Sequence, residues 1–508
     1  MIDKNHYKNS FEHRSILEES ISLLEWDNLK TQLSSFASTK LGKNAILEFD
    51  IPNEYEISRR LLQETIEINA LEKKLDKSIS FSGVFDISKN IEICSKGGVI
   101  NSSDLLEIAE TIATSKELKK ILLDFEQRPY ISSFINRLID HNQIEKILKT
   151  GIESNGRISD RASQRLAKLR QELLSKKSER RLLVDKFIQK NMNYIQDNII
   201  GDRYGRPVLA IKVQYAEKFK GIIHDSSASG NTVYLEPESV VSKGNKIASM
   251  EASVAGEEFK LLKEWSQIIR DNDKSLLDMS DILLRAEHSL TRSRYSNWIG
   301  GKSPIIDNNP VVSLMGFSHP LLIWEHKKKE APKPVSIDFH ITRNTKVVAI
   351  TGPNTGGKTV ALKGLGIALL MARSGLFIPS IKNPIIPFCP NIFVDIGDDQ
   401  SLEGNLSTFS GHILRIKNIL ESLENKIGLS VVLLDEIGSG TDPSEGTALA
   451  ISLLKEFATL SDITLATTHY GDIKALKYTD DRFENVSVAF DEESVSYTHL
   501  RAHETHRY

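Results

Sequence analysis

The stretch TKVVAITGPNTGGKT, residues 345–359, decides the fold of the C-terminal part of this chain. It opens with a short β-branched run, continues through a glycine-rich loop and leads into the apolar segment VALKGLGIALLMARSG. Strand, glycine-rich loop and helix in this order are the context that a phosphate-binding P-loop requires. The loop matches G-x-x-x-x-G-K-[ST] through Gly352, Gly357, Lys358 and Thr359. The stretch therefore predicts a parallel α/β nucleotide-binding domain.

The chemistry of this loop indicates ATP and Mg²⁺ as cofactors. Glycines let backbone N–H groups converge on phosphate oxygens, and the following helix N-terminus adds its dipole. We expect Lys358 to reach the β- and γ-phosphates and Thr359 to bind Mg²⁺. The alternative is a glycine-rich turn that binds no nucleotide. The predicted ATP-contacting residues are Gly352, Pro353, Asn354, Thr355, Gly356, Gly357, Lys358 and Thr359.

Two further strands end in candidate catalytic residues. The apolar run in LSVVLLDEIGSGTDPSEG is typical of a strand buried on both faces, and it ends in Asp435 and Glu436. Ligands of open α/β sheets bind at such strand ends, so we expect Asp435 to hold Mg²⁺ and Glu436 to orient or deprotonate the attacking water. A third strand, ITLATTHY, ends in His469, a candidate γ-phosphate sensor. The alternatives are a helix cap for the acidic pair and a structural role for the histidine.

Proline placement divides the chain. Of 15 prolines, 11 lie at or after Pro304, and none lies in 130–206 or 238–303. Long helices exclude interior proline, so these gaps predict two long helices, the first over about 157–196. Between them lies a segment with alternating apolar residues and a Ser/Gly/Asn turn, which indicates a small β unit. The simplest assembly is an antiparallel helix pair carrying a β tip.

The helix pair shows a heptad-like stripe, although Gly256 is a weak point in the second helix. Apolar positions of the stripe are Leu166, Leu169, Leu173, Leu183 and Phe187, then Ile247, Met250, Val254, Leu261, Trp265 and Ile268. Basic residues of the tip that favour contact with an anionic partner are Arg203, Arg206, Lys212, Lys218 and Lys220. The alternatives are a dimerisation coil and a merely solvated charged face.

These signals predict a multidomain chain that joins α and α/β architectures. We expect a helical domain over 1–150, long helices with a β insertion at about 200–240 within 151–300, and the nucleotide-binding domain over 301–493. Composition agrees with a soluble globular protein, with 40% apolar and 26% charged residues in 508. The net charge of −3 means that nucleic-acid binding needs a local basic surface.

Features of the termini and cysteines predict a cytoplasmic protein. Cys94 and Cys389 are far apart and in no metal-ligand spacing, which argues against a disulfide framework and suits a reducing compartment. The N-terminus shows no secretory h-region, and no apolar run reaches 18 residues.

Five motifs in order, GPNTGGKT, DIGDDQS, LSTFSGH, LLDEIGSGTDPSEG and TTHY, resemble the ATPase domain of the MutS family. Upstream, GRISDRAS, YGRPVLAIKVQY to GIIHDSSASGNTVYLEP, and SHPLL resemble the family's lever, clamp and pre-ATPase regions. The resemblance is strongest to its second bacterial branch, MutS-two, and extends to about Glu493.

The resemblance implies an ABC-type ATPase that works as a homodimer. Each nucleotide would be shared between the P-loop of one subunit and Ser407 of the other, although Ser407 can also be read as a helix N-cap. Asn354 would touch the γ-phosphate, and the loop 440–443 would cross the interface. ATP would shift the population of clamp conformations on nucleic acid.

Two partners follow from the family. The clamp would bind branched or double-stranded DNA and suppress homologous recombination, or bind ribosomal RNA and split collided ribosomes. A mismatch-repair MutS is the alternative, although its N-terminal Phe-x-Glu motif is missing, and a non-hydrolysing ABC-like scaffold is another. The family's Smr nuclease module is not in this sequence, and endonuclease activity is expected only of longer members. Residues 494–508 are expected to be a non-native tail.

Overall fold

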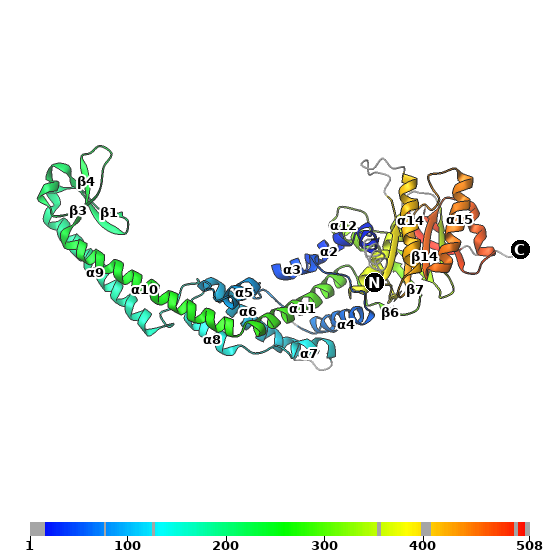
Figure 1. Cartoon of the computed structure of the whole chain (residues 1–508), viewed down its shortest axis with the longest axis horizontal. Coiled ribbons are helices and arrows are strands. Elements are labelled where there is room, and N and C mark those ends of the chain that lie inside the picture. The colour runs from blue at the N-terminus through cyan, green and yellow to red at the C-terminus, as the bar shows by residue number, and fades with distance from the viewer. Residues whose placement is uncertain are drawn as a thin grey trace, which may run out of the picture. The chain divides into compact units, whose positions relative to one another are not determined.

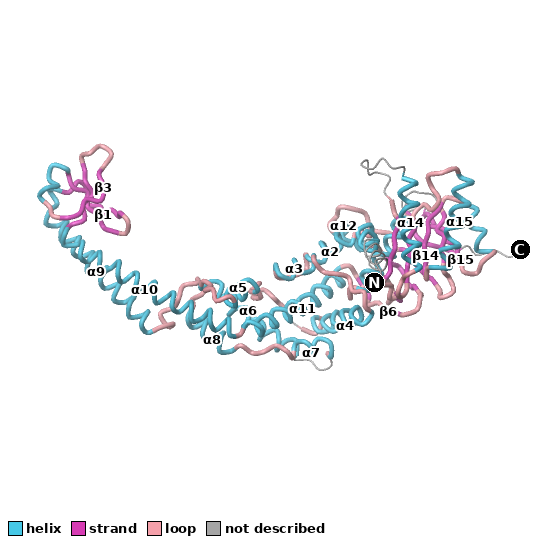
Figure 2. Tube along the Cα trace, in the orientation of Figure 1, coloured by secondary structure: helices cyan, strands magenta, loops and turns pink. Residues whose placement is uncertain are grey.

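The computed structural model describes residues 16–75, 78–123, 128–352, 357–397, 408–491 and 496–502. The chain forms two compact units (Figures 1 and 2), one from Met1–Ser82, Leu118–Leu138 and Asp281–Tyr508, the other from Gly83–Glu117 and Ile139–Ser280. Segments of the two units alternate along the sequence, so residues 1–150 contribute to both. None of the helices in these ranges is both long and apolar enough to cross a membrane.

Two long helices dominate the second unit. The helix expected over 157–196 is observed as α9, Gln164–Asn191. It begins at Gln164 because the Ser163 side chain caps it, accepting a hydrogen bond from the Leu166 N–H at 3.3 Å. Its partner α10 spans Glu238–Asp271 and continues through Gly256 without a break. Other helices with residues in this unit are α5 (Ser88–Ser95), α6 (Ser102–Leu123), α8 (Asn142–Gly151) and α11 (Asp273–Trp298).

Apolar contacts and ion pairs together hold α9 against α10. Of the predicted stripe on α9, Leu166 is buried and the other four positions are half-buried, while Val184 and Ile188 are also buried. Four ion pairs connect the described residues of the two helices: Arg165–Glu257 at 3.6 Å, Arg170–Glu258 at 2.6 Å, Lys177–Glu251 at 2.6 Å and Glu179–Lys243 at 2.9 Å. The stripe is therefore only partly enclosed, and charged side chains flank it.

A four-stranded antiparallel sheet is inserted between α9 and α10, as expected for the β unit. Its strand order is β1-β2-β4-β3. The strands span β1 Ile195–Arg203, β2 Arg206–Lys212, β3 Gly221–Ser226 and β4 Thr232–Pro237, with the 3-10 helices η1 (Met192–Tyr194) and η2 (Val213–Lys218) beside them. Its core joins strand residues such as Leu209 and Leu235 to Val184 and Ile188 of α9.

A six-stranded sheet organises the first unit. The order is β12-β13-β14-β9-β15-β16, and every pairing is parallel except the last. The strands are β9 Val347–Thr351, β12 Asn391–Asp395, β13 Ser430–Leu434, β14 Ile463–Thr468, β15 Phe483–Asp491 and β16 Ser496–Ala502. The four strands β9, β12, β13 and β14 are buried along their whole length, as parallel strands covered on both faces must be.

Helices cover both faces of this sheet (Figure 1). Alternate residues of β9 enter different cores: Val348 packs with α13, Lys358–Arg373, while Val347 packs with α14, Thr408–Glu424, and α15, Pro443–Leu460. This two-sided burial confirms the mixed α/β architecture expected from the P-loop stretch.

The remaining elements of the first unit are short. The helices are 16–23, α2 (Trp26–Ser34), α3 (Lys40–Leu47), α4 (Tyr55–Glu72), α7 (Pro129–Ile135), α12 (Pro320–Lys327) and η3 (Gly471–Tyr478). The strands are β5 (Gly301–Lys302), β6 (Ile305–Asp307), β7 (Val312–Phe317), β8 (Ile337–Ile341), β10 (Ile378–Pro379) and β11 (Ile385–Pro387).

A buried charge cluster fixes α4 against α11 in this unit. Glu64 is fully buried and accepts hydrogen bonds from Arg285, from Arg292 at 3.3 Å and from the Ser289 hydroxyl at 3.1 Å. Arg292 is itself buried and also donates to the Thr65 hydroxyl at 2.9 Å. Buried charges need such paired, hydrogen-bonded surroundings.

The segment expected to be a tail includes strand β16, which pairs antiparallel with β15 at the edge of the large sheet. Its residues 494, 495 and 503–508 lie outside the described ranges. Both cysteines, Cys94 and Cys389, are free thiols and buried.

Candidate nucleotide site

The parallel register brings the predicted site residues to one edge of the sheet. Thr351 of β9 pairs with Thr468 of β14, and Leu434 of β13 pairs with Ala466 of β14. The residues that follow these strands therefore emerge side by side at their carboxyl ends, where open α/β sheets bind ligands. Lys358 and Thr359 begin α13 at the same edge.

Lys358 is held at the mouth of the glycine-rich loop. Its side chain is buried, and its Nζ donates to the Gly352 carbonyl at 2.9 Å. Burial lowers the pKa of the Lys358 ammonium below its usual range, while the Glu436 and Asp435 carboxylates oppose that shift. Gly352 has a φ of 148°, a conformation that glycine adopts without strain. The lysine is thus desolvated and positioned beside the start of the loop.

Asp435 is the centre of a hydrogen-bonded group of oxygens. Thr359 Oγ1 donates to Asp435 Oδ2 at 2.6 Å, and the Thr467 hydroxyl donates to Asp435 Oδ1. The Asp435 N–H also donates to the Asp395 carbonyl at 2.8 Å, which extends the β12–β13 pairing by one residue. A hydroxyl and a carboxylate at hydrogen-bonding distance form the hard oxygen donor set that suits Mg²⁺.

Glu436 is held in an unusual backbone conformation that turns its side chain toward His469. Its φ is 50°, and its N–H donates to Thr467 Oγ1 at 2.8 Å while its carbonyl accepts from the Ser439 N–H at 3.0 Å. His469 Nε2 lies 3.3 Å from Glu436 Oε1. The side chain of Glu436 is 36% exposed and that of His469 is 40% exposed, so water can reach both. A carboxylate and an imidazole in contact with solvent can orient and deprotonate water.

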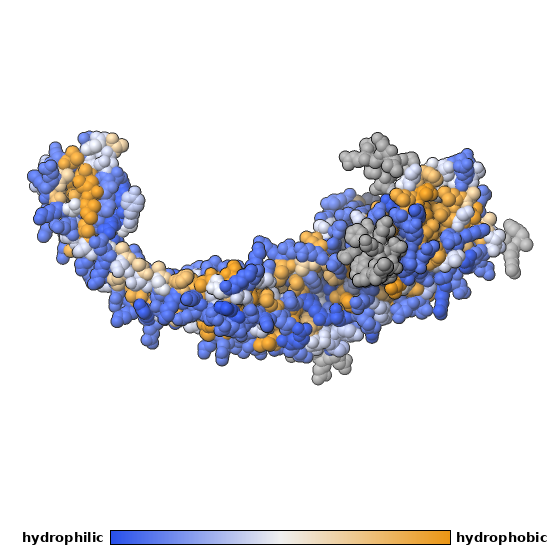
Figure 3. Space-filling model, viewed as in Figure 1, coloured by the Kyte–Doolittle hydropathy of each residue, from blue (hydrophilic) through white to orange (hydrophobic). Residues whose placement is uncertain are grey.

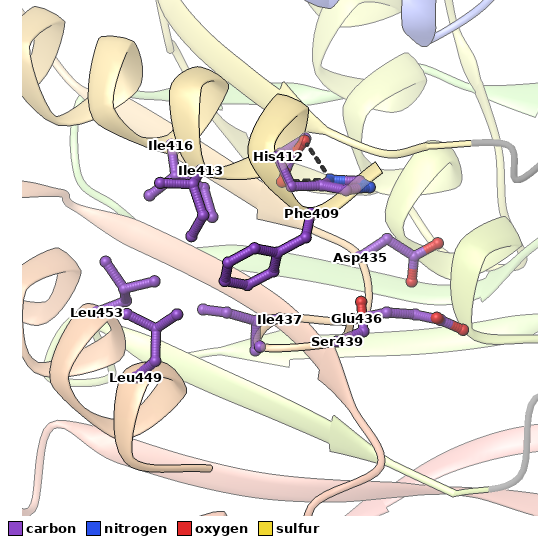
Figure 4. A pocket seen from close by; sticks show the side chains of 12 residues that line it. Phe409, His412, Ile413, Ile416, Asp435, Glu436, Ile437, Ser439, Leu449 and Leu453 are labelled. Atoms are coloured by element: carbon purple, nitrogen blue, oxygen red, sulfur yellow. Dashed lines mark hydrogen bonds and ion pairs between the residues drawn. The ribbon is translucent and has the colours of Figure 1, made fainter. Parts of the chain in front are cut away.

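The structure adds positioning residues that the sequence analysis missed. Thr467 contacts both members of the acidic pair, and its only sequence signal is a second threonine in the β14 motif TTH. Asp395 accepts from Arg415 at 2.8 Å and lies 3.0 Å from His412 Nδ1, which links strand β12 to α14. Figure 4 shows Phe409 directed between α14 and α15, toward Ile437 and Leu453.

Part of the predicted site is not described. Residues 353–356 of the glycine-rich loop and Ser407 fall outside the described ranges. Helix α14 begins at Thr408, directly after Ser407. In the loop 440–443, Asp442 caps α15, because its carboxylate accepts from the Ser444 N–H at 2.9 Å.

The basic residues of the β tip are more engaged than the sequence suggested. Arg203 pairs with Asp225 at 3.2 Å and lies over the Tyr234 ring at 4.4 Å. Arg206 pairs with the fully buried Glu236 at 3.1 Å, so part of its charge is neutralised within the sheet.

Lys218, like Arg203, contacts aromatic rings: it lies over those of Tyr194 and Tyr215 at 5.1 Å from each centroid. No carboxylate lies within ion-pair distance of Lys212 or Lys220 in the described parts of the chain. The prediction of an anion-binding tip thus rests on the lysines more than on the arginines.

Comparisons with known proteins agree with this geometry. The family model for MutS domain V matches residues 348–506, which contain the glycine-rich loop and the three strand ends. Proteins named Endonuclease MutS2 align along almost the whole chain: 39% identity over 504 residues in Synechocystis sp., covering 96% of this chain, and 34% over 486 residues in Finegoldia magna, covering 95%.

A third such protein, from Geobacillus sp., is 33% identical over 485 residues. The chain spans 60–61% of the length of these three relatives. A domain-V match over the sheet and this identity over both units lead to one conclusion: the chain belongs to the MutS2 family.

Proposed function

We propose that this chain is an ATP hydrolase of the ABC type whose nucleotide cycle drives a nucleic-acid clamp. The observation that carries the proposal is the meeting of Lys358, Thr359, Asp435, Glu436 and His469 at one sheet edge. A desolvated lysine at a glycine-rich loop, a hydroxyl–carboxylate pair and a solvent-accessible carboxylate–imidazole pair are the groups that phosphoryl transfer from a nucleotide uses.

Each residue has a role in this proposal. Lys358 binds the β- and γ-phosphates, with backbone N–H groups of the non-proline residues of the loop around them. Thr359 and Asp435 hold Mg²⁺, which bridges phosphate oxygens and neutralises the charge that develops on them. Glu436 orients or deprotonates the attacking water, and His469 keeps Glu436 in place and senses the γ-phosphate.

The site is completed by a second copy of the chain in this proposal. Glu436 and His469 are each more than a third exposed, so the water side of the site has no protein cover within the described chain. Ser407 of a partner subunit would approach the γ-phosphate there, and the loop 440–443 would lie at the interface. A nucleotide that binds across two subunits favours the closed dimer, and this couples ATP to the clamp.

The clamp is built from α9 and the β1–β4 sheet. Residues 164–237 contain 14 Lys or Arg and 8 Asp or Glu, a net charge of +6, whereas the whole chain carries −3. A basic segment in an otherwise acidic chain is the electrostatic signature of a nucleic-acid surface. The substrate is branched or double-stranded DNA, in suppression of homologous recombination, or ribosomal RNA, in the splitting of collided ribosomes. The site of action in this proposal is the cytoplasm.

ATP turnover with two matched variants tests the proposal. We expect turnover to be stimulated by four-way junction DNA or by ribosomes, more strongly at low salt because phosphate contacts release counterions. Lys358→Ala should lower ATP affinity, and Glu436→Gln should bind ATP normally but accumulate as an ATP-bound dimer in gel filtration. Turnover by Glu436→Gln at the wild-type rate would remove Glu436 from catalysis. ATP binding without turnover under any condition would favour a non-hydrolysing scaffold.

A further inference from the structure

The hairpin between β1 and β2 presents one aromatic side chain to solvent. Arg203 pairs with Arg206, so the turn consists of Tyr204 and Gly205 alone. Their φ values are 54° and 75°, which is the two-residue turn that matches the twist of a hairpin. The Tyr204 side chain is 94% exposed. Among the large apolar and aromatic residues in the described ranges, Tyr204 is the most exposed.

Nothing in the turn requires a tyrosine. The first position of such a turn favours Asn, Asp or Gly, because a bulky residue with positive φ is strained. Asp202 already stabilises the turn by accepting the Gly205 N–H at 3.0 Å. With almost all of its ring in water, Tyr204 contributes little to the core of the sheet. A strained, exposed aromatic residue at the end of a hairpin indicates a contact with another molecule.

A cationic side chain lies at the turn that carries this ring. Arg180 of α9 donates to the Gly205 carbonyl at 3.4 Å, so its guanidinium lies at the turn. Within the described ranges no carboxylate lies at ion-pair distance from Arg180. Ile199, on the same strand β1, is 69% exposed. The turn therefore combines a flat aromatic surface with a neighbouring guanidinium.

Exposed apolar residues are concentrated in this part of the second unit, and Figure 3 shows an apolar band on the sheet. The set within residues 192–223 is Met192, Ile199, Ile200, Tyr204, Val213, Ile222 and Ile223. Such a concentration on one small sheet marks a contact surface. The guanidinium of Arg180 at the β1–β2 turn favours an anionic partner over a purely apolar one.

We propose that Tyr204 stacks on an unpaired nucleobase, with Arg180 at a flanking phosphate. This inference rests on the proposed clamp function. It adds that Tyr204 is a contacting residue and that an unstacked base is the feature of the nucleic acid that Tyr204 recognises. A base inside a regular duplex offers no free face, so Tyr204 acts where bases are unstacked, at a branch point, a bulge or a single strand. The hairpin thereby prefers branched or bulged nucleic acid to plain duplex. Both DNA and RNA present this chemistry.

The test compares affinities of the full chain for three labelled probes: a four-way junction with 2-aminopurine at the branch point, a plain DNA duplex, and an RNA hairpin with one bulged base. Tyr204→Asn removes the ring and places a preferred residue in the turn, so this variant is expected to fold with a melting temperature no lower than the wild type. Tyr204→Phe keeps the stacking surface. Tyr478→Asn is the matched control, because Tyr478 is also exposed, at 71%, but lies outside the clamp.

We expect Tyr204→Asn to bind the junction or the bulged RNA roughly 5- to 150-fold more weakly, the range for one stacked base. Its duplex affinity and its salt dependence should match the wild type, since a neutral ring releases no counterions. Tyr204→Phe and the control should bind like the wild type. Quenching of 2-aminopurine by the wild type, lost in Tyr204→Asn, would report the stack directly. The more affected probe identifies DNA or RNA as the source of the base.

Other results overturn the inference. If Tyr204→Asn and the wild type bind the junction with equal affinity, Tyr204 does not contact nucleic acid and the exposed hairpin would instead contact a protein. If Tyr204→Asn loses as much affinity for the duplex as for the junction, the ring does not recognise unpaired bases. A loss in Tyr204→Phe as large as in Tyr204→Asn would assign the contact to the hydroxyl. If the wild type binds none of the three probes, the proposed clamp function fails as well, so the two failures are distinguishable.

Discussion

Replacing Thr467 by valine tests how the acidic pair is held. Thr467 is fully buried, its hydroxyl donates to Asp435, and its Oγ1 accepts the Glu436 N–H at 2.8 Å. Valine keeps the shape of the side chain and removes both bonds. A hydrogen bond to a charged group contributes about 1.5–3 kcal/mol. If the two carboxylates need it to bind Mg²⁺ and water, that energy corresponds to a loss of roughly 10- to 100-fold in activity or metal affinity.

The assay is steady-state ATP turnover across a Mg²⁺ titration, with binding of a fluorescent ATP analogue at each Mg²⁺ concentration as a readout independent of catalysis. Thr467→Val should shift the Mg²⁺ midpoint upward and lower turnover by that factor. Thr464→Val is the control on the same strand. Thr464 is also fully buried, but among the described residues its hydroxyl bonds to the Ser461 hydroxyl alone, at 2.6 Å, and Ser461 has a second partner in the Phe457 carbonyl at 2.8 Å.

The control should therefore keep wild-type Mg²⁺ dependence while losing similar folding stability. Turnover and Mg²⁺ midpoint of Thr467→Val within twofold of the wild type would refute the reasoning, because the hydroxyl would then not position the acidic pair. Equal losses in both variants would point to a general weakening of β14.

Three further predictions concern stability. Glu64→Gln should lower the free energy of unfolding by about 3–5 kcal/mol in urea titrations, because it leaves the buried Arg292 without its carboxylate, whereas a loss below about 1 kcal/mol would contradict a charged cluster. Gly256→Ala should raise the free energy of unfolding by about 0.5–1 kcal/mol, and with it the melting temperature of the second unit, because the added Cβ meets open space in α10. A lower melting temperature would mean that the glycine is a required hinge. Burial lowers the pKa of His288 and of His319 to about 4, so the unfolded state binds more protons below pH 6.5, and stability should fall by about 2 kcal/mol per histidine between pH 7.5 and 5. His319→Gln should flatten that dependence in tryptophan-monitored unfolding, and an unchanged slope would contradict a neutral buried histidine.

The residues of the candidate nucleotide site are easier to locate from sequence than the contacts of the helix pair. A P-loop is a contiguous motif with a fixed strand–loop–helix context, so Lys358, Thr359 and the strand ending at Asp435 can be located from the order of residues alone. Thr467 escapes such a prediction because its partners are 31 and 32 residues away and only the strand register brings them together. The residues next to Thr467 in the sequence do not indicate which distant residues it will contact.

The same reason explains why the contacts of the β tip and of the helix pair could not be predicted from sequence. Arg206 looks like a free cation in the sequence, yet it pairs with Glu236, which lies 30 residues away and is buried. The leucines of α9 follow a heptad spacing, but most of them are only half-buried, and charged residues beside them find partners on α10. Periodicity predicts a helix reliably, whereas the face that becomes buried depends on the partner.

The ion-pair contact between α9 and α10 has a mechanical consequence. Buried apolar residues lie along the pair: Leu166 and Leu261 toward one end, Ile247 further along α10, and Val184 and Ile188 toward the other end. The partly exposed salt bridges between the helices each contribute only about 0–1 kcal/mol. Exchanging one such bridge for another costs little compared with opening an apolar core, and salt weakens these bridges further. The apolar contacts therefore hold the pair together, whereas its charged contacts can rearrange at low cost.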